Sequence, residues 1–248
     1  MSVLSTVFPR VPLKQMDLAM LVFELDRETQ RVMPVSSELI TSAATMASYL
    51  HRNQARFVRG GLPRVPYIEH PLRVALRLIR WGVRDPFLVA AALLHDVVED
   101  CADELIAMFG RPGDSPVQCL SRLYGPVLAG YVMRVTNPAE GDAVTGAEAY
   151  QTHVTELAWS GSAAVLIKAS DLKDNAGSIR HQFGHGKDDR MLRMLGKYLP
   201  VVREVATALS TVSLPDQPGI VRAAAAADMH ELAKNLDALA AEHDVART

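Results

Sequence analysis

The sequence predicts an all-α helical bundle, and three observations lead to this fold class. Apolar residues recur every three or four positions over long stretches, for example over 68–79. Proline and glycine stand where helices would begin and end, as Pro86 and Gly82 do. No segment alternates apolar and polar residues as a half-buried strand would.

The first two helices are delimited by a proline and a pair of serines. A first amphipathic helix is expected over 14–32, because Pro34 ends its pattern. Ser36 or Ser37 can cap a second helix that runs to about residue 54.

The next two helices flank a short turn. Residues 56–67 contain two glycines and two prolines, which predicts a loop. A helix follows from about Ile68 and ends before Gly82. Asp85 then offers a capping carboxylate directly before a proline, which predicts the start of an apolar helix that carries HDVVED at its end.

The remaining helices are read from the same periodicity. Loops at RPGDSP, TNPAEGDAVTG, HQFGHGKD and LPDQPG separate them. The helices are expected over 103–110, 117–135, 147–159, 165–175, 189–213 and 220–245.

Composition excludes several classes of protein. The 248 residues include 26 Lys+Arg and 28 Asp+Glu, a net charge of −2 that argues against a broad nucleic-acid or membrane surface. The two cysteines, Cys101 and Cys119, make no disulfide framework. No signal peptide or membrane span is expected. A cytoplasmic enzyme or binding protein is the simplest interpretation.

The segment AALLHDVVED places four ionisable side chains within six residues at the end of an apolar helix. On a continuous helix, His95 and Glu99 are i,i+4 neighbours, and so are Asp96 and Asp100. Crowded carboxylates repel one another, and a divalent cation bound by imidazole and carboxylate groups would relieve that repulsion.

Further ligands must come from elsewhere in the chain. PYIEHPLRVA places His70 in the first turn of a helix. IKASDLKDN places Asp171 after an apolar run, with Asn175 one turn later on the same face.

Together these motifs resemble the HD superfamily of metal-dependent phosphohydrolases. PYIEHPLRVA, HDVVED and the K-x-x-D-x-x-x-N pattern are similar to the hydrolase domain of RelA/SpoT homologues, here in the stand-alone form of a small alarmone hydrolase. The resemblance spans roughly 36–210 and implies an HD-domain helical bundle. We therefore expect an HD-type hydrolase domain over 36–213, with helical extensions over 1–35 and 214–248.

The resemblance implies hydrolysis of the 3′-pyrophosphate of guanosine tetra- or pentaphosphate, (p)ppGpp, with one Mn²⁺. By position, the implied metal ligands are His70, His95, Asp96 and Asp171. Glu99 and Asp100 match the pair that orients or deprotonates the attacking water. The implied substrate contacts are Arg56, Lys168, Asn175 and Tyr198. The partner is a small nucleotide, and a homo-oligomer stays open.

A substrate with several phosphates also needs cations around its pocket. Further candidates are Arg59, Arg64 and Lys173. Each substrate contact also has a structural interpretation: the arginines as a solvated loop, Asn175 as a helix cap, and Tyr198 as a core residue.

Departures from the family pattern leave other functions open. Phe57 stands where a lysine is common, and TNPAEGD offers no lysine to the substrate. One alternative is an HD phosphohydrolase for an adenosine alarmone such as (p)ppApp, or for a phosphorylated cofactor such as NADPH. Another is a non-catalytic nucleotide-binding domain, although the like-charged pair of Glu99 and Asp100 argues against it.

Overall fold

The computed structural model describes residues 11–56, 63–138 and 143–243, and within them the all-α prediction is confirmed. In chain order the elements are η1 (Leu13–Gln15), α2 (Leu18–Val32), η2 (Pro34–Ser36), α3 (Ser37–Leu50), β1 (Ala55–Arg56), β2 (Val65–Pro66), α4 (Glu69–Trp81), α5 (Pro86–Leu94), α6 (Val97–Asp100), α7 (Ala102–Phe109), α8 (Pro116–Tyr124), α9 (Pro126–Val135), α10 (Ala143–Trp159), α11 (Ala164–Asn175), η3 (Ala176–Gln182), α12 (Asp188–Thr211) and α13 (Gly219–Glu242).

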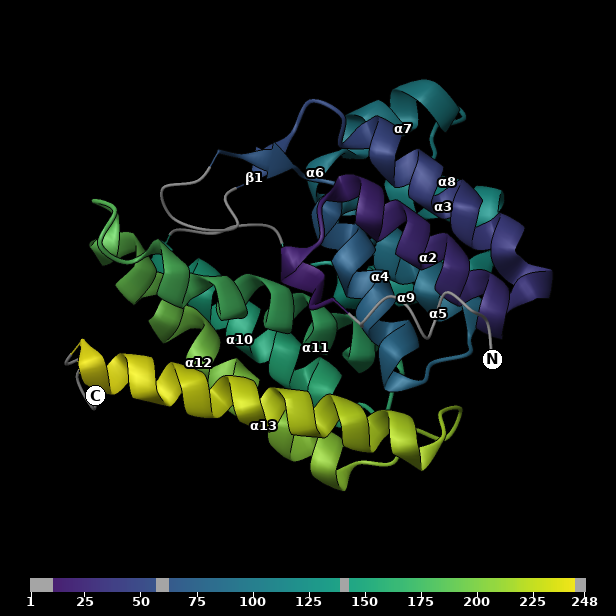
Figure 1. Ribbon diagram of the computed structural model, residues 1–248. Helices are drawn as coiled ribbons and strands as arrows, with labels where there is room; N and C mark the ends of the chain where they lie inside the picture. The colour runs from purple at the N-terminus through teal and green to yellow at the C-terminus, as the bar shows by residue number, and fades with distance from the viewer. Residues whose placement is uncertain (1–10, 57–62, 139–142, 244–248) are drawn as a thin grey trace.

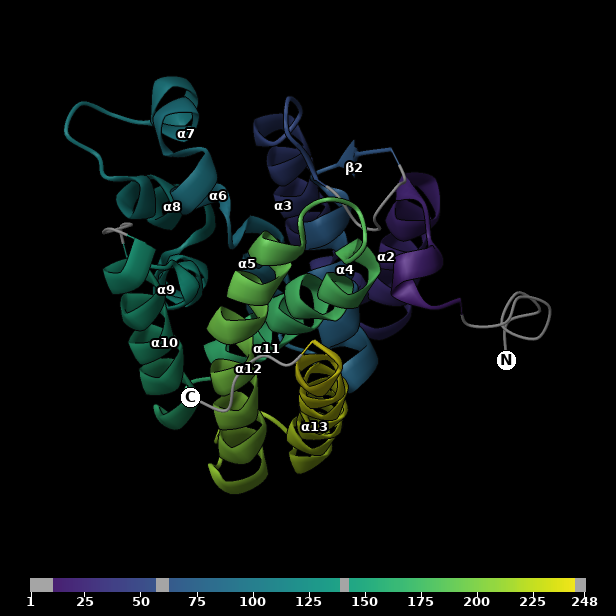
Figure 2. The same cartoon turned by 90° about the vertical axis from the view of Figure 1, so that its left-hand side faces the viewer.

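The helices surround a central group formed by α4, α5 and α11 (Figures 1 and 2). Helices α12 and α13 lie alongside each other on one side of this group, and α7 lies on the opposite side. Every residue from Leu88 to Leu94 in α5 is fully buried, because neighbouring helices cover all of its faces. The candidate metal ligands occur where α4, α5 and α11 meet.

Helix α4 ends and helix α5 begins as the sequence predicted. Gly82 follows α4 with a φ of +106°, a left-handed conformation that glycine adopts without strain. The Asp85 carboxylate accepts hydrogen bonds from the backbone N–H groups of Phe87 and Leu88, at 2.9 and 3.2 Å, and so caps α5.

Three local predictions were wrong. The helix that carries HDVVED is not continuous: α5 ends at Leu94, and α6 begins at Val97, so His95 and Asp96 form a turn. Gly125, with a φ of +87°, divides the helix expected over 117–135. Ser36 precedes α3 without a capping side-chain hydrogen bond.

The loop expected over 56–67 contains a minimal antiparallel sheet. Ala55 pairs with Pro66, and Arg56 pairs with Val65. Two-residue strands are too short to leave an alternating pattern in the sequence. The pairing holds Arg56 beside the segment that leads into α4.

Both terminal extensions pack against the bundle. Leu21 and Leu25 of α2, and Val221 and Met229 of α13, belong to the same hydrophobic core as α4 and α5. The division into a hydrolase domain with two extensions stays a prediction. Within the described residues, no helix has the length and apolar character needed to cross a bilayer.

Replacing Gly82 by alanine is expected to destabilise the fold by about 1–2 kcal/mol, because a left-handed backbone strains any residue with a Cβ atom. Gly130 lies inside α9, and a Cβ atom there meets nothing within 4 Å, so Gly130→Ala should stabilise the fold by up to about 1 kcal/mol. Urea unfolding of both variants tests this, and equal effects would contradict it.

Candidate metal centre

Two buried histidines present the same ring nitrogen to a common point. His70 lies in the first turn of α4, and its Nδ1 is 2.8 Å from Oδ2 of Asp174. His95 follows α5, and its Nδ1 donates to the carbonyl oxygen of Ala92 at 2.8 Å. A carbonyl or carboxylate oxygen accepts, so Nδ1 carries the proton in both rings. Each Nε2 is then directed into the cluster as a potential ligand.

Two carboxylates complete the cluster. Asp171 Oδ1 lies 3.2 Å from His70 Nε2 and 3.8 Å from His95 Nε2. One ligand atom from each of these three residues falls within 4.8 Å of the others. Asp96 contacts both rings, with Oδ2 at 3.4 Å from His70 Nε2 and Oδ1 at 3.2 Å from His95 Nε2. The structure therefore brings together all four predicted ligands.

The donor set fits a divalent cation. Nε2 of His95 is buried and accepts no hydrogen bond from the described residues, which is costly for a polar atom unless something binds it. Burial opposes protonation of His95, but Asp96 and Asp171 outweigh that effect and raise its pKa to about 9. Imidazole nitrogens with carboxylate oxygens suit transition metals such as Mn²⁺.

Glu99 lies at the solvent-facing edge of the cluster, on α6. Its carboxylate accepts hydrogen bonds from the backbone N–H and the side-chain amide of Asn137, the latter at 2.9 Å. Desolvation raises the pKa of Glu99, although the bond from the Asn137 backbone opposes the rise. Desolvation and the charge of Asp96 raise the pKa of Asp100 too. A carboxyl group with a raised pKa is suited to acid–base catalysis.

Three predicted substrate contacts lie beside the candidate metal ligands. Lys168 is buried, and its Nζ donates to Oδ1 of Asn137 at 3.1 Å and lies 3.9 Å from Oδ2 of Asp171. Asn175 donates to Oδ1 of Asp171 at 2.6 Å. Arg56 donates to the side-chain oxygen of Asn175. These side chains surround the cluster with donors that a phosphate could use.

The other predicted substrate contacts differ in where they lie relative to the candidate metal ligands. Tyr198 packs edge-to-face against Tyr150, and the centre of the Tyr150 ring lies 5.7 Å from Nζ of Lys168. Burial, followed by the charge of Asp171, raises the pKa of Tyr198. Lys173 does not lie beside the candidate metal ligands: its Nζ contacts Glu231 at 2.8 Å on α13, because it occupies another face of α11 than Asp171. Arg59 lies outside the described residues, and Arg64 is exposed.

Three residues of the site were missed by the sequence analysis. Tyr67 donates from its hydroxyl to Oδ2 of Asp96 at 2.7 Å. Asn137 joins Glu99 to Lys168. Asp174 holds His70, and Nε and Nη2 of Arg73 donate to its two carboxylate oxygens. The sequence did carry a signal for Asp174. It is a second aspartate in the apolar helix that contains Asp171, and a buried carboxylate requires partners.

Comparisons with known proteins show which proteins this chain is similar to. No family model matches the chain. It is 38% identical over 90 residues to a probable guanosine-3′,5′-bis(diphosphate) 3′-pyrophosphohydrolase of Mycoplasma pneumoniae, covering 35% of this chain and 12% of that protein. It is 30% identical over 135 residues to the guanosine-3′,5′-bis(diphosphate) 3′-pyrophosphohydrolase of Drosophila melanogaster, covering 54% of this chain and 65% of that protein. The predicted resemblance is confirmed.

The fold comparison agrees. A solved structure described as a metazoan orthologue of SpoT that hydrolyses ppGpp matches with a TM-score of 0.58 and 22% sequence identity. The match covers 79% of this chain and 94% of that one, so the two share a fold over most of their lengths. The chain thus spans nearly all of that structure but about a tenth of the Mycoplasma relative.

Proposed function

We propose that this chain hydrolyses the 3′-pyrophosphate of (p)ppGpp in a divalent-metal-dependent reaction, releasing GDP or GTP and pyrophosphate. The observation that carries the proposal is that one ligand atom each from His70, His95 and Asp171, which lie far apart in the sequence, falls within 4.8 Å of the others. Similarity to relatives named as pyrophosphohydrolases of this nucleotide supports the choice of substrate.

The metal is proposed to be Mn²⁺, held by His70, His95, Asp96 and Asp171. Lewis-acid polarisation of a phosphoryl oxygen is the chemistry that a bound divalent cation supplies. The protein orients the ligands: Asp174 fixes the His70 ring, the Ala92 carbonyl fixes the His95 ring, and Tyr67 holds Asp96.

Proton transfer is assigned to Glu99, with Asp100 beside it. In the hydrolysis, a water oxygen bonds to the phosphorus while the bond from phosphorus to the ribose 3′-oxygen breaks. Glu99 accepts the proton from the water and can return it to the 3′-oxygen, because its raised pKa suits both directions. Asn137 orients the Glu99 carboxylate, and Lys168 in turn anchors Asn137.

Phosphate binding is assigned to Arg56, Lys168 and Asn175, and Tyr198 is assigned as a further substrate contact. Nζ of Lys168 lies 3.9 Å from Oδ2 of Asp171, where it can also contact an incoming phosphate. Arg56 lies 5.5 Å from the centre of the Tyr67 ring, a stacked position that holds its guanidinium at the edge of the site.

Incubation of the metal-free protein with Mn²⁺ and ppGpp tests the proposal directly. Equal molar amounts of GDP and pyrophosphate are expected, with no turnover in excess chelator. The same assay with ppApp and NADPH tests the alternatives that Phe57 and the lysine-free loop raise. Faster turnover of an adenine substrate would replace the guanine assignment, and no turnover of any substrate would remove the proposal.

Replacing Glu99 by glutamine is expected to lower kcat by about 10²–10⁴-fold, the usual contribution of a positioned acid–base group. The amide keeps the shape of the side chain but cannot accept the water proton. Glu104→Gln is the matched control and should leave kcat unchanged. Glu104 lies on α7, and its carboxylate pairs with Arg52 at 2.6 Å. Similar rates for the two variants would exclude Glu99 as the base.

A further inference from the structure

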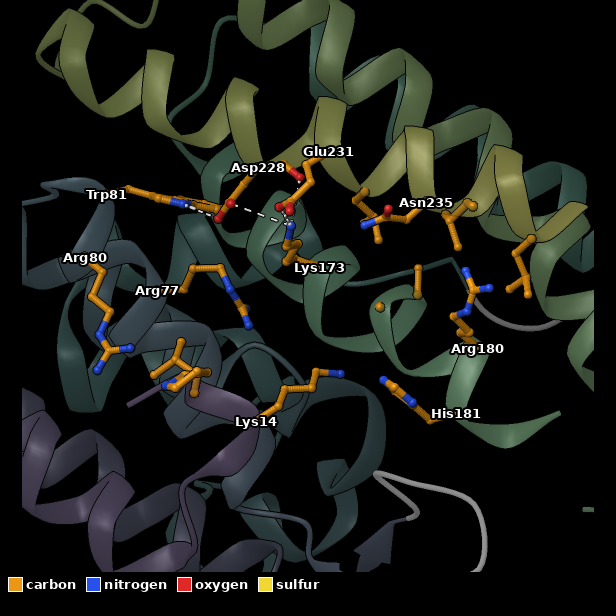
Figure 3. A pocket seen from close by; sticks show the side chains of 17 residues that line it. Lys14, Arg77, Arg80, Trp81, Lys173, Arg180, His181, Asp228, Glu231 and Asn235 are labelled. Carbon is orange, nitrogen blue, oxygen red and sulfur yellow. Dashed lines mark hydrogen bonds and ion pairs between the residues drawn. The ribbon is translucent and has the colours of Figure 1, made fainter. Parts of the chain in front are cut away.

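A separate cavity of about 600 Å³ lies between η1, α4, the end of α11, η3 and α13 (Figure 3). Its volume falls in the range of small-molecule sites. None of the four candidate metal ligands is among the described residues that line it. We call it the α4–α13 cavity.

Basic side chains outnumber carboxylates in the lining of the α4–α13 cavity. Its lining contains two carboxylates, from Asp228 and Glu231, against five lysines and arginines: Lys14, Arg77, Arg80, Lys173 and Arg180. Carboxylates outside the lining pair with four of these cations: Glu24 with Arg80, Glu242 with Arg180, and Asp174 with both Lys14 and Arg77. Because Lys14 and Arg77 share the single carboxylate of Asp174, their end of the cavity keeps an excess of positive charge, which favours an anionic occupant.

Some polar groups in the cavity have capacity for a ligand. Arg180 uses Nη2 alone for Glu242, at 2.6 and 2.9 Å, so its Nε and Nη1 have no acceptor among the described residues. His181 and Asn235 form neither a hydrogen bond nor an ion pair with any residue in the described part of the chain. Figure 3 shows His181 and Lys14 extending toward each other across the cavity.

The other basic groups are held in place by the protein. Lys14 donates to the carbonyl oxygen of Asp174 at 2.5 Å, and Arg77 donates to the carbonyl oxygen of Ser170 at 2.8 Å. Burial lowers the pKa of Lys14 to about 8, although the carboxylate of Asp174 opposes this effect. Fixed cations of this kind form a preorganised site, because they need little reordering when an anion binds.

The remaining wall is apolar. Trp81 and four leucines contribute to it: Leu13, Leu232, Leu236 and Leu239. Apolar surface beside a basic end suits a molecule with a ring or carbon skeleton attached to its anionic group. Arginine is the usual partner of multiply charged phosphate, which it contacts with several donors.

We propose that the α4–α13 cavity binds a small organic phosphate, at a site separate from the candidate metal centre. The proposal concerns binding alone and does not depend on the reaction proposed above. Its measurement likewise requires neither a bound metal nor turnover.

The fluorescence of Trp81 provides a local reporter. The chain has two tryptophans, and Trp159 lies outside the cavity, where it is 45% exposed, so Trp159→Phe leaves Trp81 as the sole tryptophan. This variant is titrated in chelator with ADP, GDP and ribose 5-phosphate, and with citrate and pyrophosphate for comparison. A saturable change is expected with at least one of the organic phosphates.

Matched variants locate the binding. Arg180→Gln and His181→Ala should each weaken it, by about tenfold or more for the arginine. Arg203→Gln is the control for the first, because Arg203 is an exposed arginine that also pairs with an acidic residue of α13, Asp237. His185→Ala is the control for the second, because His185 is exposed and does not line the cavity. Both controls should leave the affinity unchanged.

Three results would overturn the proposal. The first is no saturable change with any organic phosphate. The second is equal weakening by the variants and their controls, which would indicate general charge attraction. The third is citrate or pyrophosphate binding as tightly as the best organic phosphate, which would remove the phosphate or the organic part of the assignment.

Discussion

Replacing His95 by alanine is expected to abolish Mn²⁺ binding and to lower kcat/KM by roughly 10³-fold or more. A metal that polarises a phosphoryl oxygen is worth several kcal/mol, and each 1.4 kcal/mol corresponds to about a factor of ten. The Nε2 atom of His95 is a buried nitrogen with no hydrogen-bond partner among the described residues, so the substitution removes a candidate ligand without breaking a hydrogen bond of that atom.

Thermodynamic linkage separates loss of the metal from loss of the fold. Mn²⁺ at a hundred times its Kd should stabilise the unmodified protein by about 2.7 kcal/mol and should leave His95→Ala unaffected. His230→Ala is the control, because this exposed histidine bonds to Ser210 on α12, away from the cluster. A His95→Ala protein that still gains stability from Mn²⁺ would show that His95 is not a ligand.

Replacing Asp174 by asparagine should destabilise the fold by about 3–5 kcal/mol, the usual cost of leaving buried charge without its partner. Its carboxylate is buried and contacts Arg73 at 2.9 Å, Arg77 at 3.6 Å and His70 at 2.8 Å. Burial opposes its ionisation, but Lys14 and Arg73 hold the pKa of Asp174 well below its usual range. Without that negative charge, the surrounding cations repel one another in a desolvated space.

The same substitution should weaken Mn²⁺ binding by about 10–100-fold, because Asp174 orients His70 and increases the basicity of its Nε2. Urea unfolding measures the stability, and calorimetric titration measures the metal affinity. Asp237→Asn serves as the control, since its exposed pair with Arg203 is worth about 0–1 kcal/mol. Equal stability losses in the two variants would contradict the assigned role of Asp174.

Residues of one helix, α11, face three different parts of the molecule. Asp171 and Asn175 are one turn apart and lie on the face of α11 directed at the two histidines. Asp174 faces α4, where it meets Arg73, and Lys173 faces Glu231 of α13. Successive helical positions differ by about 100° around the axis, so adjacent residues in the sequence serve different interfaces.

The elements of the fold were predictable where local chemistry determines them. Asp85 and Gly82 delimit their helices in the expected way because capping and left-handed turns depend on a few neighbouring residues. The break at His95 was not predictable from periodicity. The break lies where His95 meets His70 and Asp171 from other parts of the chain, a tertiary arrangement that apolar periodicity does not encode.

The clustering of the four candidate ligands was predictable, and the residues that support them were less so. Resemblance located the two histidines and two aspartates, which the structure brings together. Lys173 was wrongly predicted as a cation of the phosphate pocket, because charge alone does not show which face of a helix a residue occupies. Asn137 lies in a polar loop, and its contact with Glu99 spans 38 residues, a separation that no local pattern reveals.

The most direct test of the metal centre is an anomalous difference map, measured at the manganese edge, from crystals grown with Mn²⁺. We predict one peak at coordination distance from Nε2 of His70, Nε2 of His95 and a carboxylate oxygen of Asp171, with Asp96 beside it. A fully occupied peak elsewhere, with none between these side chains, would contradict the account.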